Sequence, residues 1–138
     1  MGAEPGIIRI LWCCCRRLQP AGDVYKRQVL LAAVCDGMGG LAQGEIASGY
    51  VTERLQEWFY ESVLYAVRKK KPYWVIRRSL DRLTFHMQQQ LQQYARQEEI
   101  DLGTTMTVLV IWERTYLIWH LGDSRLYRLR GRHMERVT

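Results

Sequence analysis

The sequence predicts an α+β fold, in which an antiparallel sheet forms part of a β-sandwich and two long helices pack on it. Three observations support this class. The apolar run Val29–Cys35 is typical of a buried strand. Apolar side chains recur at helical spacing over residues 45–67 and 73–99. From Gly103 onward, segments rich in Val, Ile, Thr, Tyr and Trp indicate strands.

The first strand and the two helices follow one another along the chain. Val29–Cys35 shows no polar alternation, so we expect both of its faces to be buried. A loop with four glycines extends from the strand to Gly44, and the first helix is predicted to begin at Glu45, where a carboxylate suits the positive end of the helix dipole. The basic stretch Arg68–Pro72 separates the helices, and Pro72 is expected in the first turn of the second.

Three strands are predicted in the last third of the chain, at residues 104–112, 115–121 and 125–130. Gly131 and Arg132 form a turn into the final residues. Because short turns join these strands, we expect an antiparallel meander.

Residues 1–28 show neither a helical nor a strand period. They carry five Lys and Arg against two acids, so half of the formal charge of +6 comes from a fifth of the chain. We interpret 1–28 as a leader of doubtful origin, either an assembly artefact joined to a gene fragment, which we favour, or a genuine membrane-touching or palmitoylated leader. Residues 29–138 are interpreted as the N-terminal part of one domain. With the leader set aside, the basic excess gives little support to nucleic-acid binding, for which Arg68–Lys71 is the one local argument.

The sequence favours a cytoplasmic protein with reduced thiols. It has no CxxC pair to suggest a zinc site, and Cys35 lies inside an apolar run, where a free thiol behaves as a small hydrophobic residue. The apolar stretch near Arg9 is too short to span a bilayer, so no membrane span is expected.

Two acids each end an apolar strand beside a glycine: Asp36 and Asp123. Carboxylates at the ends of neighbouring strands point into a common opening, and Mg²⁺ and Mn²⁺ prefer carboxylate, carbonyl and water oxygens. Simpler roles stay open at this point. Asp36 could cap a turn or helix, and Asp123 could pair with Arg125 or cap a turn.

Three segments, VCDGMGGLAQGEIAS (34–48), LGTTMTVLVI (102–111) and HLGDSRLYRLRG (120–131), resemble successive motifs of the metal-dependent Ser/Thr protein phosphatases of type 2C, in their bacterial form. The resemblance covers about residues 29–138. It implies an incomplete α-β-β-α phosphatase fold, truncated at both ends.

The resemblance also implies roles for individual residues. Asp36 matches the aspartate that bridges two catalytic Mn²⁺ or Mg²⁺ ions, and Gly37 matches a glycine whose carbonyl is a metal ligand. Asp123 matches a ligand of a third, more weakly held ion, and Met38 stands where animal relatives carry a histidine proposed as general acid. Structural roles are implied for Gly39, Gly40, Gly103, Thr104, Thr105, Gly122, Ser124 and Arg125.

The activity implied is hydrolysis of phosphoserine and phosphothreonine in proteins by a metal-activated water. The partners implied are phosphorylated proteins, namely Ser/Thr kinases and their substrates, with no nucleic acid, and the complete protein is expected to be a monomer.

The family's phosphate-gripping arginine, its upstream acidic cluster and two later aspartates have no counterpart in residues 29–138. Because these residues are missing, we expect little or no activity from the 138 residues alone. The parent protein is expected to be active. The alternative is an inactive phosphatase-like binding or regulatory module.

Overall fold

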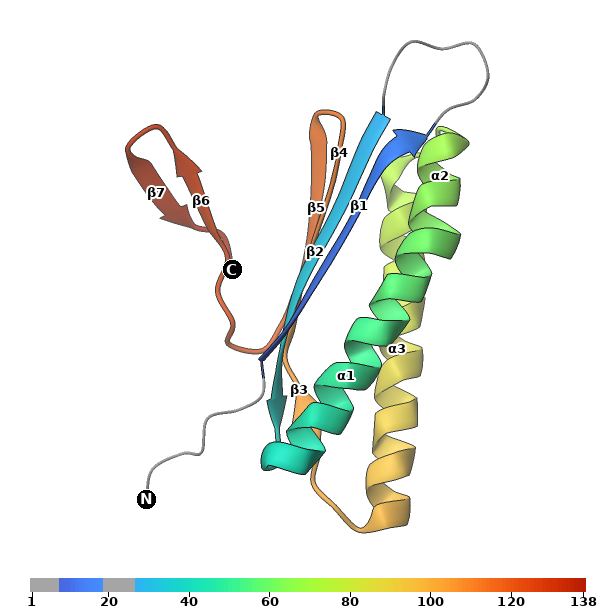
Figure 1. Cartoon of the computed structure of the whole chain (residues 1–138), viewed down its shortest axis with the longest axis vertical. Coiled ribbons are helices and arrows are strands. Elements are labelled where there is room, and N and C mark those ends of the chain that lie inside the picture. Colours follow the sequence, from blue (N-terminus) through green and yellow to red (C-terminus); the bar gives the residue numbers. More distant parts are fainter. Residues whose placement is uncertain (1–7, 19–26) are drawn as a thin grey trace.

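The computed structural model describes residues 8–18 and 27–138, and it divides into a helical layer and a sheet (Figure 1). In the helical layer, α1 (Leu41–Trp58), a π-helical turn (Phe59–Val63) and α2 (Leu64–Arg68) form one continuous helix, and α3 (Tyr73–Glu98) lies antiparallel to it.

The main sheet has the strand order β1-β2-β4-β5, with β3 also pairing with β2, and all of its pairs are antiparallel. Its strands are β1 (Ile8–Leu18), β2 (Arg27–Met38), β3 (Gly103–Thr104), β4 (Met106–Trp112) and β5 (Thr115–Leu121). The predicted strand 104–112 is interrupted at Thr105, so that β3 and β4 are separate elements.

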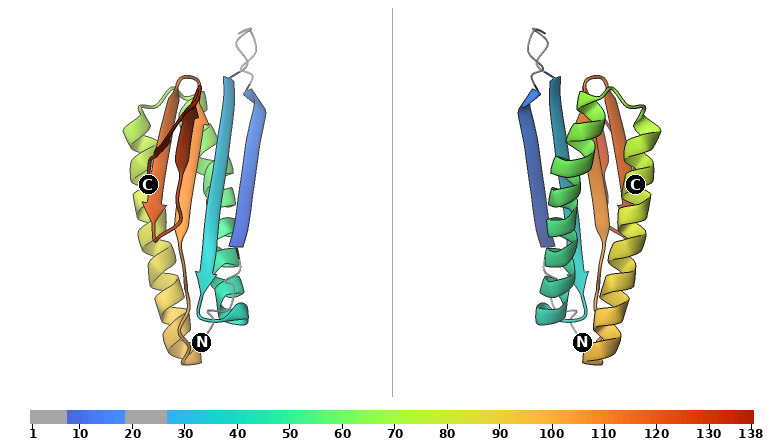
Figure 2. Two further views of the ribbon diagram at one scale, coloured as in Figure 1. Left: turned by 90° about the vertical axis from the view of Figure 1, so that its left-hand side faces the viewer. Right: turned by 90° about the vertical axis from the view of Figure 1, so that its right-hand side faces the viewer.

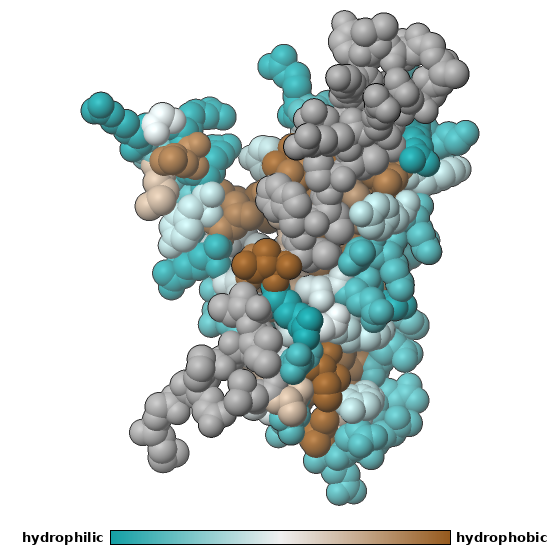
Figure 3. All heavy atoms as spheres, in the orientation of Figure 1, coloured by the Kyte–Doolittle hydropathy of each residue, from teal (hydrophilic) through white to brown (hydrophobic). Residues whose placement is uncertain are grey.

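The last two strands, β6 (Tyr127–Arg130) and β7 (His133–Arg136), form a separate two-stranded sheet on the side away from the helices (Figure 2). The expected single meander is therefore wrong: the chain leaves the main sheet after β5 and forms a second hairpin. Hydrophobic side chains lie at the surface of this hairpin, where Leu129 and Met134 are largely exposed (Figure 3). The α+β class with two helices packed on an antiparallel sheet is confirmed.

The hydrophobic core lies between the main sheet and the helices. On β2, every second residue from Val29 to Gly37 is buried, whereas Leu30, Ala32 and Val34 are only partly buried. The prediction that both faces of this strand are buried is therefore wrong, because helices cover one face of the sheet and only the small hairpin lies on the other side.

The helices begin and pack differently from the prediction in two details. The first helix starts at Leu41, four residues early, so Gly44 lies inside it rather than in a loop; Pro72 is the residue before α3, not in its first turn. The two helices are linked where the indole N–H of Trp58 donates to Ser79 Oγ at 2.8 Å.

One strand lies where the sequence predicts none. β1 pairs with β2 along its length, with Arg9 opposite Cys35, so part of residues 1–28 belongs to the sheet. Residues 1–7 and 19–26 of the predicted leader lie outside the described residues. Within the described part of the chain, no helix has the length and apolar character to cross a membrane.

Candidate metal site at the end of β2

Asp36 lies near the end of β2, where β2 meets β3 and the start of α1. This end of β2 points toward the lower end of the molecule in Figure 1. Its backbone is held on both sides by one residue. The Asp36 N–H donates to Thr105 Oγ1 at 3.0 Å, and the Thr105 N–H donates to the Asp36 carbonyl at 2.9 Å. Thr105 is 5% exposed, so this clamp fixes the backbone from which the carboxylate projects.

The carboxylate of Asp36 is only partly satisfied. Its Oδ1 is buried and has no hydrogen-bond partner among the described residues. A buried carboxylate oxygen without a donor costs free energy, because the protein does not replace the hydration it has lost. A divalent cation is the kind of group that supplies the missing interaction. On this observation, the donor set at Asp36 fits Mn²⁺ or Mg²⁺.

Gly37 is held by a close approach of two backbones. A Cβ built on Gly37 would lie 2.6 Å from Gly44 Cα and closer still to the Gly44 carbonyl, so only glycine fits here. The buried hydroxyl of Ser48 donates to the Gly44 carbonyl at 2.7 Å. The end of β2 and the first turns of α1 therefore fix the Gly37 backbone without any side chain of its own.

Glycine is also sterically required at Gly39 in the first motif and at Gly122 in the third. Gly39 has φ +100°, and a Cβ there would meet the Asp101 carbonyl. Gly122 has φ +105°, and its Cβ would lie 2.7 Å from Thr105 Cγ2. Gly40 precedes α1 with φ +87°. These positions favour glycine because L side chains rarely adopt positive φ.

The second motif is placed against the first by strand pairing. Thr104 pairs with Gly37 and Gly103 with Met38 in the β2–β3 ladder. The Met38 side chain is 57% exposed, and a Cβ on Gly103 would lie 3.4 Å from its methyl carbon.

The third motif contacts Thr105 through the hydroxyl of Ser124. Ser124 Oγ lies 3.0 Å from Thr105 Oγ1, so a short chain of hydrogen bonds joins Ser124 to the Asp36 backbone. Asp123 and Arg125 are both exposed, and among the described residues no ion pair joins them. The described residues contain no cluster of three or more His, Cys, Asp or Glu side chains with metal-binding geometry. Hydrogen bonds thus link the Asp36 backbone to Thr105 and, through it, to Ser124. Within the part of the chain that the structure describes, no cluster of further acidic side chains surrounds Asp36.

Cys35 precedes Asp36 but points into the core. It is fully buried, and desolvation raises the pKa of its thiol from 9.0 to about 12. A thiol that stays protonated is not a nucleophile at neutral pH. The core role predicted for Cys35 agrees with this environment.

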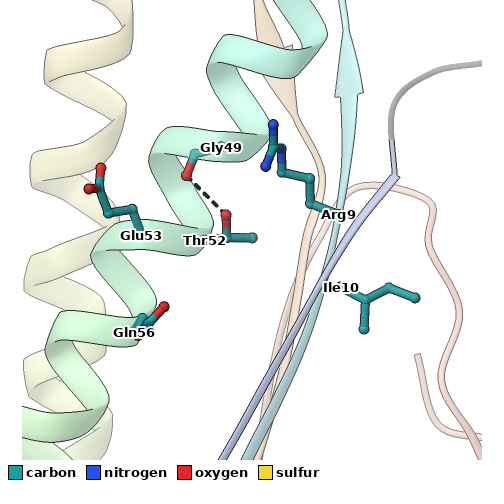
Figure 4. Close-up of a pocket in the computed structure, with 6 residues that line it drawn as sticks. All are labelled: Arg9, Ile10, Gly49, Thr52, Glu53 and Gln56. Atoms are coloured by element: carbon teal, nitrogen blue, oxygen red, sulfur yellow. Dashed lines mark hydrogen bonds between the residues drawn. The ribbon is translucent and has the colours of Figure 1, made fainter.

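Arg9 lines a groove beside α1 that the sequence did not predict, because the N-terminal segment was excluded from the fold prediction. Arg9 Nη2 lies 2.8 Å from Glu45 Oε1, and the guanidinium packs on Gly49. Together with Thr52, Glu53 and other residues, it lines an open groove between β1 and α1 (Figure 4). Arg27, the arginine nearest in sequence to the expected phosphate-gripping position, pairs with Leu18 at the opposite end of β2 from Asp36.

Comparison with known proteins agrees with this architecture. The profile of the family described as Protein phosphatase 2C matches residues 19–138. The protein phosphatase PhpP of Streptococcus pneumoniae is 27% identical over 113 residues, which is 82% of this chain and 43% of PhpP. The chain therefore spans less than half of the length of this curated relative.

Solved structures show the same fold. Serine/threonine phosphatase Stp1 from Staphylococcus aureus superposes with a TM-score of 0.67 at 25% identity, covering 100% of this chain and 56% of Stp1. The phosphatase PstP/Ppp of Mycobacterium tuberculosis gives a TM-score of 0.61 at 25% identity, covering 95% of this chain and 54% of PstP. With three motifs converging on Asp36 and a family profile matching most of its length, this chain belongs to the protein phosphatase 2C family.

Proposed function

We propose that the protein to which this chain belongs hydrolyses phosphoserine and phosphothreonine in other proteins, with two Mn²⁺ or Mg²⁺ ions at Asp36. The observation that carries this proposal is the buried, unpartnered Oδ1 of Asp36 on a backbone clamped by Thr105. Such an arrangement holds a carboxylate in place but leaves its charge for a ligand. The PstP catalytic domain has been solved in complex with two manganese ions.

The residues present divide the work as follows. Asp36 would bridge the two ions, and the Gly37 carbonyl, fixed against Gly44, would be a further ligand. Asp123, on the exposed loop after β5, would hold a third and weaker ion. When bound, such ions supply Lewis-acid activation of a water and neutralise the phosphoryl charge.

The residues of this chain around Asp36 hold the backbone in place. Thr105 holds the backbone at Asp36, and Ser48 holds the backbone at Gly44. Cys35, next to Asp36, keeps its thiol proton and is therefore unreactive. Met38 has no titratable proton, so it does not serve as the acid that protonates the leaving alkoxide. We expect a water molecule to do so.

The same proposal places the protein in the cytoplasm as a monomer when complete, acting on phosphorylated Ser/Thr kinases and on the substrates of those kinases. Family membership supports this choice of substrate class. Nucleic acid is not a partner in this proposal.

Manganese binding tests the proposal directly. Mn²⁺ is titrated into the chain and into the Asp36→Asn and Asp123→Asn variants, and free Mn²⁺ is measured by electron paramagnetic resonance. We expect Asp36→Asn to abolish the tighter binding and Asp123→Asn to weaken only a later phase. Bound Mn²⁺ at about 100 times its Kd raises stability by about 2.7 kcal/mol, and Asp36→Asn loses this gain.

Turnover is measured in parallel on a phosphothreonine peptide with Mn²⁺. Binding at Asp36 without turnover, in a chain extended to the length of its relatives, would favour the inactive binding module. Mn²⁺ binding that is unchanged by Asp36→Asn would contradict the metal assignment itself.

A further inference from the structure

The turn that joins α2 to α3 concentrates positive charge and aromatic side chains. We name it the basic–aromatic turn and define it by nine exposed residues: Tyr65, Arg68, Lys69, Lys70, Lys71, Tyr73, Trp74, Arg77 and Arg78. It lies at the upper end of the molecule in Figure 1, whereas the end of β2 that carries Asp36 points toward the lower end. The candidate metal site does not use it.

The positive charge of this turn is not compensated within its own segment. Between Glu61 and Asp81 the chain carries six Lys and Arg and no acid. Among the described residues, no side chain of these six cations forms an ion pair. Such a surface is complementary to a partner with dense negative charge.

The turn is ordered by its own backbone. The N–H groups of Lys69, Lys70 and Lys71 donate to carbonyls of the preceding helical turns at 2.9 to 3.1 Å. Lys70 adopts φ +52°, where glycine is usually preferred, yet the position holds a lysine. The three lysines therefore project from a fixed backbone, which lowers the entropic cost of binding.

The aromatic side chains stand among these cations. Tyr65, Tyr73 and Trp74 are 55%, 57% and 54% exposed. Tyr73 and Trp74 lie one helical turn from Arg77 and Arg78, so each shares a face of α3 with a cation. Tyr and Trp with Lys and Arg around them match the interface of a lipid bilayer, where amphipathic rings lie at the level of the headgroups.

We propose that the basic–aromatic turn binds the surface of an anionic phospholipid membrane. Clusters of about four to eight Lys and Arg are typical of segments that bind anionic lipid headgroups. Single-stranded nucleic acid, the other dense anion, follows a groove along which aromatic rings stack. Here charge and aromatic rings occupy the end of a two-helix turn, which suits contact with a surface. Membrane binding at this end leaves the Asp36 end free, and it does not depend on phosphatase activity.

The experiment measures binding of the whole chain to vesicles. Vesicles of phosphatidylglycerol mixed with phosphatidylcholine are compared with phosphatidylcholine alone, by co-sedimentation at low salt. The test variant is Lys69→Gln/Lys70→Gln/Lys71→Gln. The control, Arg96→Gln/Arg130→Gln/Arg132→Gln, makes the same change in net charge at exposed positions outside the turn. Circular dichroism confirms that both variants fold.

We expect binding only to vesicles with phosphatidylglycerol. Each cation at the surface contributes about fivefold to the partition coefficient, so the test variant loses about 100-fold and the control no more than about fivefold. Vesicle binding also shifts tryptophan emission to the blue in the wild type, and Trp74→Phe abolishes that shift.

Three results would overturn the proposal. They are no binding of the wild type to phosphatidylglycerol, equal losses in the test and control variants, and tighter binding to a fluorescent single-stranded oligonucleotide than to vesicles. None of these results bears on Mn²⁺ binding at Asp36, so the proposed function stands or falls separately.

Discussion

Replacing Thr105 by valine tests whether one hydroxyl holds the candidate site together. Thr105→Val keeps the shape of the side chain but removes the acceptor of the Asp36 N–H and the partner of Ser124. A buried donor left unpaired costs about 1–3 kcal/mol, and the lost bond to Ser124 adds about 1 kcal/mol, less where water reaches Ser124. We expect the free energy of unfolding to fall by about 2–4 kcal/mol.

The assay is urea unfolding followed by circular dichroism, with two comparison variants. Thr105→Ser keeps the hydroxyl and loses one methyl, so it should cost about 1 kcal/mol. Thr84→Val removes a buried hydroxyl that has no partner among the described residues, so it should be neutral or stabilising. If Thr105→Val matches Thr84→Val within about 0.5 kcal/mol, the hydroxyl does not hold the site and the reasoning is refuted.

Two further predictions concern the neighbours of Asp36. Gly37→Ala places a methyl against the Gly44 backbone and should lower the free energy of unfolding by about 3 kcal/mol or more. The control is Gly49→Ala, whose Cβ would lie 3.6 Å from the nearest atom, on the Arg9 side chain. In the same unfolding assay it should stabilise the protein by about 0.5–1 kcal/mol. Burial raises the Cys35 pKa from 9.0 to about 12, so the unfolded state loses its thiol proton first and stability falls as pH rises through this window. Between pH 10 and 11 the stability of the wild type should fall more steeply than that of Cys35→Ala, by about 1 kcal/mol per pH unit, and equal slopes would contradict this.

Much of the fold could be predicted because its elements have strong local periods. The stripe along residues 73–99 and the strand 115–121 agree with α3 and β5 to within one residue. The first helix was placed four residues late, because glycines at 37, 39, 40 and 44 read as a loop. Gly44 is helical for a tertiary reason, the close approach of Gly37, which no local pattern records.

The candidate site was predictable as a set of motifs, but not as a network. Asp36 and Asp123 could be found because each ends an apolar strand beside a glycine. That Thr105 and Ser124 share a hydrogen bond depends on how β3, β4 and the loop after β5 meet in space. Strand β1 was missed because its sequence lacks alternation, and its pairing with β2 is visible only in the folded chain.

The π-helical turn Phe59–Val63 has a consequence for how the two ends of the molecule are aligned. Its extra residue, marked by the Leu64 N–H bonding to the Phe59 carbonyl, offsets the helical phase before α2 begins. If the same residues formed a regular α-helix instead, everything beyond them would be rotated by about 100°. Val67 would leave the core, and the lysines that follow it would face another direction. The local irregularity thus acts as a phase adjustment, setting the direction of the basic–aromatic turn relative to the strand that carries Asp36.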